Sequence, residues 1–172
     1  MGGRVGSASD RQGRRMDAVR LIETSRRALT TTTGGVPELS AEVWQAQALA
    51  QAIGSRLAVT GPPELRGEAL GLTELAGRGC GVLDTPRLGA GELRAALLTD
   101  LGDARQVLLH LGGLLGEVGI ALVGMASAAD DEALYWQCVE AIDAADESRD
   151  RVLEMLRKLA DRDRTLAERE AG

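Results

Sequence analysis

The chain has 172 residues, a formal net charge of −6, two cysteines and 2% aromatic residues. This length suits one domain with a sizeable core, and two cysteines are too few for the disulfide framework of a small secreted protein. The acidic balance disfavours nucleic acid as a partner, because proteins that neutralise phosphates usually carry a basic patch. Since the N-terminus also lacks the apolar stretch of a signal peptide, we expect a cytoplasmic protein with reduced thiols.

A polar segment and a first helix are predicted at the N-terminal end of the chain. Residues 1–15 are rich in Gly, Ser and Arg, and we expect a disordered extension there. A helix follows at about residues 16–31, and the Thr- and Gly-rich stretch at 30–35 ends it. One face of this helix carries Val19, Ile22, Arg26 and Leu29.

Two further helices are predicted at about residues 37–59 and 63–78, with a Gly-Pro-Pro break between them. Their apolar residues recur in alternating steps of four and three, which is typical of packed helices. In the first helix these residues are Leu39, Val43, Ala46, Ala50, Ile53 and Leu57. In the second they are Leu65, Ala69, Leu72 and Ala76.

The longest apolar pattern lies in the second half of the chain and predicts two long helices, at about residues 90–126 and 131–168. The apolar positions of the first are Leu97, Leu101, Ala104, Leu108, Leu111, Leu115, Val118, Leu122 and Met125. The second pattern comprises Tyr135, Cys138, Ile142, Ala145, Arg149, Val152, Leu156 and Leu159. A turn at 127–131, with Asp130 or Asp131 as the N-cap, would let the two helices pack antiparallel.

The two patterns also predict which residues face each other across this hairpin. The expected pairs run from Leu122 with Tyr135, through Leu108 with Arg149 and Ala104 with Val152, to Leu97 with Leu159. We therefore predict an all-α bundle of about five helices, with the long antiparallel hairpin formed by the last two. It would form a single domain over residues 16–168, followed by a disordered tail at 169–172.

The 20 residues from 107 to 126 are largely apolar, which raises the question of a membrane span. They include His110, Glu117 and five glycines, so we expect a helix buried on several sides and no membrane span. Three of the glycines lie where small residues would let a neighbouring helix approach closely. These three are Gly112, Gly116 and Gly119.

His110 is the single histidine of the chain, and Arg105 precedes it by five residues on a predicted helix. This Arg-x4-His arrangement resembles the Arg-x4–6-His signature of HEPN-type helical ribonucleases, whose active sites form between small α-bundles. The resemblance implies that Arg105 would hold a phosphate while His110 transfers a proton. The alternative is a polar stripe on the least buried face of the helix, made of Asp103, Gln106, His110, Gly113 and Glu117.

Glu117 lies in the most apolar stretch, with Glu140 and Asp143 expected one layer away on the last helix. Bundles that bind two metal ions use inward-facing Glu residues together with Glu-x-x-His motifs. Because this chain has one histidine and no such motif, we expect no metal site and no cofactor. Glu117 and Glu140, together with Trp136, are candidates for lining a small-ligand site, and solvated carboxylates are the alternative.

Arg149 interrupts the apolar pattern of the last helix. Its side chain would reach out of the hairpin, pair with Asp146 or Asp103, or fix the register of the two helices. Binding the phosphate of a ligand is the remaining alternative for this residue.

Trp44, Tyr135 and Trp136 are the only aromatic residues. Tyr135 belongs to the apolar pattern and is expected in the core, whereas the two tryptophans fall just beside the apolar stripes. Trp44 and Trp136 would cover helix edges or anchor a partner, since Trp is enriched in binding hot spots.

Four segments resemble a family of small, uncharacterised helical proteins of actinobacteria (Streptomyces-type) whose function is unknown. They are MDAVRLIETSRRAL (16–29), WQAQALAQAIGSRLAV (44–59), GPPELRGEALGL (61–72) and LYWQCVEAIDAADESRDRV (134–152). The likeness covers about residues 16–159, which would make residues 1–15 an extension. It implies a cytoplasmic actinobacterial protein and supplies no activity, substrate or catalytic residue.

The sequence carries no Walker loop, no Rossmann fingerprint and no assignable Ser/His/acid set. Its large helical surface favours a non-enzymatic protein that acts in protein–protein interaction or regulation, with an unidentified protein partner or as a homodimer. Two alternatives stay open. One is an RNA-cleaving helical enzyme that uses Arg105 and His110, and the other is a helical bundle that binds a small ligand.

Overall fold

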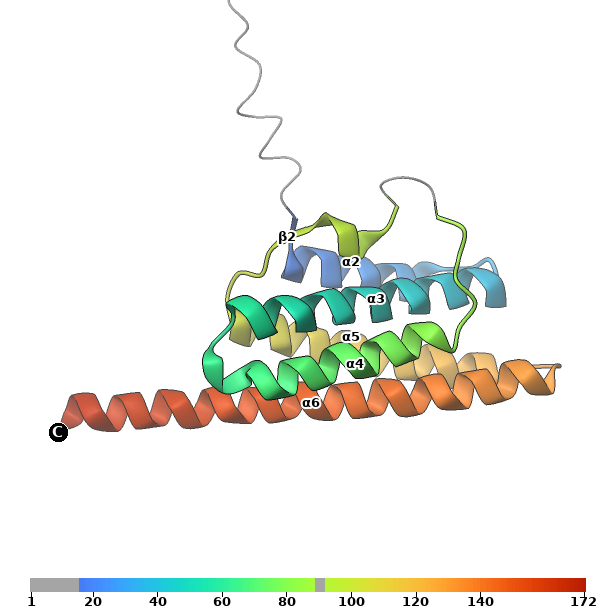
Figure 1. Ribbon diagram of the computed structural model, residues 1–172. Coiled ribbons are helices and arrows are strands. Elements are labelled where there is room, and N and C mark those ends of the chain that lie inside the picture. The colour runs from blue at the N-terminus through green and yellow to red at the C-terminus, as the bar shows by residue number, and fades with distance from the viewer. Residues whose placement is uncertain (1–15, 89–91) are drawn as a thin grey trace, which may run out of the picture.

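A computed structural model describes residues 16–88 and 92–172 and shows an all-α bundle, as the sequence predicts (Figure 1). The extension expected at residues 1–15 lies outside the described part of the chain. Within that part, the five α-helices are α2 (Ala18–Thr31), α3 (Val36–Thr60), α4 (Arg66–Gly81), α5 (Ala104–Ser127) and α6 (Glu132–Ala171).

The helices form a closed ring in cross-section. Passing round it, α6 packs on α4, α4 on α3, α3 on α2, α2 on α5, and α5 again on α6. α3 also contacts α5 across the ring, so α5 touches three other helices. Aliphatic side chains from all five helices fill the space between them, and α6 runs along one edge of the bundle (Figure 1).

The first three helices follow the sequence prediction closely. Asp17 caps α2 by accepting a hydrogen bond from the Arg20 amide at 2.8 Å, and Pro37 lies in the first turn of α3. A short 3-10 turn, η1 (Pro63–Leu65), leads into α4. The predicted apolar residues of α3 from position 43 onward and all four of α4 are fully buried: Val43, Ala46, Ala50, Ile53, Leu57, Leu65, Ala69, Leu72 and Ala76.

The predicted antiparallel hairpin is present, because α5 and α6 pack along each other after a turn at residues 128–131. Asp131 is the N-cap of α6 and accepts a hydrogen bond from the Ala133 amide at 3.1 Å. α6 has 40 residues and continues to Ala171, three residues beyond its expected end. Its last part extends past the other helices as a free helix end, with every residue from 163 onward exposed (Figure 1).

The predicted start of the long helix at residue 90 is wrong, because α5 begins at Ala104. The described residues before it form a 3-10 turn, η2 (Arg94–Leu97), and a short strand, β2 (Leu98–Asp100), which pairs in parallel with β1 (Met16–Asp17). Gly102 has a φ of +72° and Asp103 accepts a hydrogen bond from the Gln106 amide. A left-handed glycine followed by a capping aspartate fixes the start of the helix here.

The buried stripe of α6 is also displaced from the predicted one. Cys138, Ala145, Val152 and Leu159 are buried as expected. Tyr135 is exposed, contrary to the prediction, and Arg149 is exposed, in line with one of the alternatives for it. The further buried positions are Ala141, Ala144, Ser148 and Met155. α6 packs on α4 as well as on α5, so its buried face is centred between these two neighbours and is not confined to the hairpin seam.

The register of the hairpin differs from the predicted one at the position where it can be read directly. A Cβ atom placed on Gly112 would lie 3.6 Å from Cγ1 of Val152. The predicted partner of Val152 was Ala104, which lies eight residues, or about 12 Å, from Gly112 toward the N-terminus of α5. Val152 is therefore level with a more C-terminal part of α5 than its position in the sequence pattern implied.

Among the described residues, α5 is the helix with the length and apolar composition of a membrane span. A core helix of a soluble protein meets the same criterion. In the most apolar stretch of α5, only 39% of the residues are buried inside the bundle. α5 therefore contributes to the core on one side and leaves apolar residues at the surface on the other.

Candidate functional site

The solvent-facing side of α5 carries exposed apolar residues where an amphipathic helix would carry polar ones. Seven positions share this side at steps of four or three, so we call them the outer face of α5. The outer face consists of Arg105, Leu109, Gly112, Gly116, Ile120, Val123 and Ser127. Leu109, Ile120 and Val123 are 48%, 74% and 53% exposed, respectively.

Two glycines on or beside this face of α5 are not explained by packing inside the bundle. A Cβ atom placed on Gly116, or on the neighbouring Gly119, would meet no other atom within 4 Å. A Cβ on Gly112 would make an ordinary contact with Val152. Each glycine in a helix interior costs about 1 kcal/mol relative to alanine, so this helix retains a destabilising residue at Gly116 where the protomer has space for a larger one.

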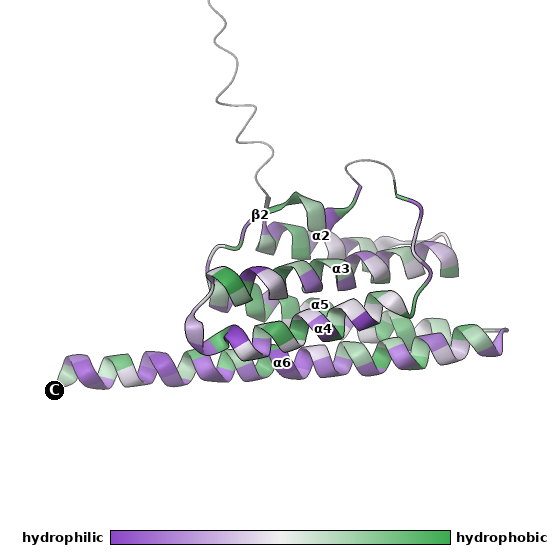
Figure 2. Ribbon diagram, in the orientation of Figure 1, coloured by the Kyte–Doolittle hydropathy of each residue, from purple (hydrophilic) through white to green (hydrophobic). Residues whose placement is uncertain are grey.

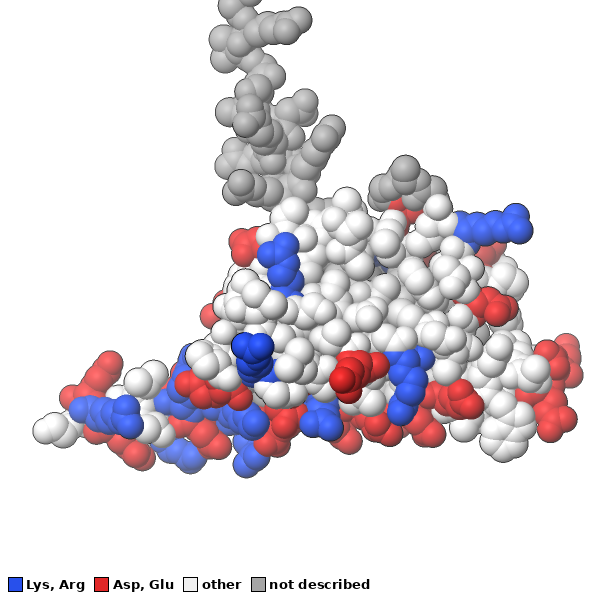
Figure 3. All heavy atoms as spheres, in the orientation of Figure 1, with Lys and Arg blue, Asp and Glu red and all other residues white. Residues whose placement is uncertain are grey.

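The outer face is nearly free of charge. Across all of α5, Arg105 and Glu117 are the only residues with a formal charge, and the helix colours as predominantly hydrophobic (Figure 2). α6, by contrast, carries 11 acidic and 7 basic residues, and Figure 3 shows charges of both signs gathered along it. An uncharged, partly apolar helix face on a protein with a net charge of −6 is suited to contact with apolar surface.

Glu117 leaves α5 beside the outer face and pairs with Arg26 of α2. The Arg26 Nε and Nη2 atoms donate hydrogen bonds of 3.1 and 2.8 Å to the same carboxylate oxygen. These hydrogen bonds raise the pKa of the Arg26 guanidinium, which lies over Gly113. The pair neutralises the one carboxylate of α5 and lies between α2 and the outer face.

Two exposed aromatic residues follow the turn at the end of α5. Tyr135 and Trp136 are 44% and 55% exposed, and their rings contact edge to face with centroids 5.3 Å apart. The Trp136 indole N–H donates to a carboxylate oxygen of Glu132 at 3.4 Å. Both rings lie near the start of α6, at the end of the hairpin where α5 finishes.

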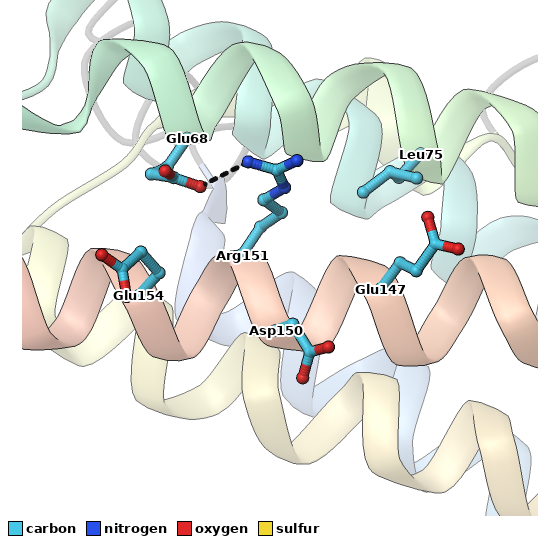
Figure 4. A pocket seen from close by; sticks show the side chains of 6 residues that line it. All are labelled: Glu68, Leu75, Glu147, Asp150, Arg151 and Glu154. Atoms are coloured by element: carbon cyan, nitrogen blue, oxygen red, sulfur yellow. Dashed lines mark hydrogen bonds and ion pairs between the residues drawn. The ribbon is translucent and has the colours of Figure 1, made fainter.

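A second surface feature is a groove of about 430 Å3 between α4 and α6 (Figure 4). Its lining residues are Glu68, Leu75, Glu147, Asp150, Arg151 and Glu154. An Arg151 Nη1 atom lies 2.9 Å from a Glu68 carboxylate oxygen, and the Lys158 ammonium lies 3.6 Å from the other oxygen of the same carboxylate. The hydrogen bond to Glu68 raises the pKa of Arg151.

These charges mainly connect α4 to α6. Further along the same groove, Arg78 of α4 and Glu147 of α6 approach to 3.5 Å, with Glu140 and Asp143 beside them. Such partly exposed ion pairs each contribute about 0–1 kcal/mol to stability. The packing of α4 on α6 therefore depends mostly on the buried residues beneath the groove. We interpret it as a charged helix–helix border.

The structure does not bring Arg105 and His110 together on one side of α5. Five positions along an α-helix correspond to a rotation of about 140°, so the two side chains leave α5 in different directions. Arg105 is exposed on the outer face, whereas His110 is half-buried beside it. The spacing that resembles the ribonuclease signature therefore does not produce a joint Arg–His site within one protomer.

The carboxylates proposed to line a ligand site are also separated. Glu117, whose side chain is 26% exposed, pairs with Arg26 on the α2 side of α5 and away from the α6 carboxylates. Glu140 and Asp143 lie in the α4–α6 groove near Arg78. No group of three metal-ligating side chains occurs within residues 16–88 and 92–172.

The remaining candidates lie at the surface or at the edge of the core. Trp44 is half-buried and packs against the core, while Trp136 is exposed. Arg149 is exposed on α6 and does not interrupt a buried seam. Cys138 is buried, and burial raises the pKa of the Cys80 thiol to about 12, so both residues are inert thiols at neutral pH.

Sequence reasoning missed the outer face as a unit. Its residues fall on both sides of the predicted seam, and Leu109, Ile120 and Val123 look like ordinary core residues in an apolar run. Gly112 and Gly116 could have indicated it, because two small residues four positions apart are typical of a close contact with another helix. The sequence alone could not show that this contact is absent from the bundle.

A protein family described as a family of unknown function, DUF6099, matches residues 16–158. The match covers the whole described bundle up to the last buried turn of α6. No curated protein and no solved structure matches the chain.

Proposed function

We propose that the chain, which belongs to the DUF6099 family of unknown function, acts as a non-enzymatic interaction protein that binds another protein chain through the outer face of α5. The observation that carries this proposal is the exposure of Leu109, Ile120 and Val123 on an otherwise uncharged helix. Exposed apolar surface that is contiguous along a helix is the common basis of helix-to-helix recognition between proteins.

The geometry of the outer face supports a protein partner. Glycines at two central positions leave shallow spaces between the exposed apolar side chains, so a helix with complementary bulky residues can approach closely. Tyr135 and Trp136 add aromatic surface at one end, and aromatic residues dominate the energy of many protein interfaces.

Photo-crosslinking in cells of the source organism tests this function. A photoreactive phenylalanine analogue replaces Ile120 in one strain and Val59 in a control strain. Val59 is also an exposed aliphatic residue, at 82%, but it belongs to α3. We expect light-dependent protein adducts from position 120 and none from position 59.

The adducts also identify the occupant of the outer face. Their masses and peptide fragments distinguish a second copy of this chain from a different protein. Absence of protein adducts from position 120, in cells where the full-length chain is present, would contradict the proposed function.

A further inference from the structure

We infer that the occupant of the outer face is a second copy of this chain, and that the two α5 helices cross antiparallel about a two-fold axis at Gly116. This inference rests on the proposed function and names its partner. Four observations carry it: the complementary sizes of residues at symmetric positions, the open space over Gly116, the absence of carboxylates from the outer face, and its area.

The positions of the outer face are spaced symmetrically about Gly116, and the residues at equal distances from it differ in size or charge. Gly112 and Ile120 lie four residues to either side, Leu109 and Val123 lie seven, and Arg105 and Ser127 lie eleven. When two identical helices cross antiparallel about a two-fold axis, a residue on one side of the axis faces the residue equally distant on the other side. Leu109 then faces Val123 of the second copy, and Gly112 faces Ile120.

This pairing fills the space that the protomer leaves empty. Ile120 is 74% exposed in the protomer, and its side chain would pack between Gly112 of the second copy, which borders Val152, and the open space over Gly116. Gly116 would face Gly116, where no side chain separates the two backbones. Two helices with glycine at their crossing can approach to the short end of the usual interaxial range of about 8–10 Å.

The charge distribution agrees with self-association on this face. Each chain carries a formal charge of −6, so two copies repel each other over most orientations. On the outer face the one charged residue, Arg105, would lie opposite Ser127 and near the polar turn of the second copy. The outer face itself contains no carboxylate, and the neighbouring Glu117 is paired with Arg26 at its border.

The area of the face is sufficient for a stable dimer. The 24 residues of α5 extend over about 36 Å. With the adjoining edges of α2 and α6, at interaxial distances of 8–10 Å, the surface is about 20 Å wide, or about 700 Å2 in plan. An interface of standard size buries about 800 Å2 on each partner.

The first experiment measures the mass of the purified full chain by sedimentation equilibrium from about 1 to about 100 μM, the range in which interfaces of this size often dissociate. We expect the mass to approach twice 18.1 kDa. Leu109→Asp should weaken the dimer by at least about tenfold, because it introduces a charge into the apolar interface of both copies.

Leu70→Asp is the matched control. Leu70 is 48% exposed, as Leu109 is, but it lies on α4, which packs on α3 and α6. Its substitution should leave the dimer unchanged. Gly116→Leu, whose side chain has open space in the protomer, should preserve the helix content measured by circular dichroism and dissociate the dimer.

The second experiment tests the antiparallel pairing by oxidative crosslinking. Leu109→Cys and Val123→Cys chains are prepared separately and then mixed. We expect a disulfide-linked dimer to form rapidly in the mixture and slowly in either variant alone, since residues at position 109 of the two copies would be about 21 Å apart. Rapid crosslinking of each variant with itself would overturn the proposed pairing.

Two other occupants of the outer face are outcomes that would overturn the inference. A monomer at all concentrations that still gives adducts with a different protein from position 120 would exclude the homodimer and leave the interaction function standing. A monomer that floats with phosphatidylethanolamine–phosphatidylglycerol vesicles, and loses this binding in Leu109→Asp, would assign the outer face to a lipid surface.

Discussion

Arg26 and Glu117 are 91 positions apart in the sequence, and their ion pair is the one charged link between α2 and α5 in the described residues. Both were visible as charged residues within apolar surroundings, and Arg26 was expected on the apolar face of its helix. Their pairing was not visible, because it depends on how α2 lies against α5. A charged residue in an apolar pattern indicates that a partner is needed and does not identify the partner.

We predict that Arg26→Ala lowers the free energy of unfolding by about 1–3 kcal/mol, because it leaves the partly buried carboxylate of Glu117 without its donors. One oxygen of that carboxylate is already buried without a hydrogen-bond partner, so the group has little access to water. Urea denaturation of the purified variant measures the change.

Arg27→Ala is the control for this variant, since Arg27 is the next residue and is exposed. Its effect should stay within about 0.5 kcal/mol. Equal effects of the two substitutions would show that the Arg26–Glu117 pair does not stabilise the bundle.

At the scale of the elements, the amphipathic pattern predicted α3 and α4 almost completely. Each has a single broad buried face, so a step of four and three identifies its core residues. The same pattern was less accurate for α6, whose buried face is centred between α4 and α5 and not on the hairpin seam. The start of α5 escaped prediction because Gly102 and Asp103, and the pairing of β2 with β1, interrupt an apolar run that would otherwise continue the helix.

The free end of α6 can be removed with little effect on the bundle. All residues from 163 onward are exposed, and the family match ends at residue 158, close to the last buried residue, Leu159. We predict that deleting residues 164–172 shifts the melting temperature by less than about 2 °C, which corresponds to well under 1 kcal/mol for a domain of this size.

A longer deletion, of residues 156–172, is the comparison. It removes Leu156 and Leu159 from the core and should cost about 2 kcal/mol or more. Thermal unfolding followed by circular dichroism measures both variants. A large loss of stability on the shorter deletion would mean that the exposed helix end makes contacts essential to the fold.

At the scale of the whole molecule, the distribution of charge separates two kinds of surface. α6 and the α4–α6 groove carry ion pairs of both signs, while the outer face of α5 carries a single arginine at one end. An excess of negative charge keeps the protein dispersed in solution, and an uncharged face allows contact at one place. The proposed homodimer follows from this contrast together with the complementary sizes of the residues spaced symmetrically around Gly116.

We predict that the homodimer tightens when salt is added. Screening weakens the repulsion between two chains of charge −6, and Arg105 is the one formal charge on the outer face that could lose an attraction. Sedimentation equilibrium at about 50 and about 300 mM sodium chloride, where the Debye length falls from roughly 14 to roughly 6 Å, compares the dissociation constants. A dimer that weakens with salt would point to an interface made by charged residues elsewhere on the molecule.

The sequence by itself determined the fold class, the hairpin of the last two helices and most of the core, because the period of apolar residues is a local property of each helix. Only the tertiary structure decided where α5 begins, which residue neutralises Glu117 and which glycines have open space above them. These features depend on what lies beside a helix, and the same spacing of leucines and glycines suits a neighbour from this chain or from another. A Cβ atom on Gly116 would meet no atom of this chain within 4 Å, and we therefore propose that Gly116 faces another chain.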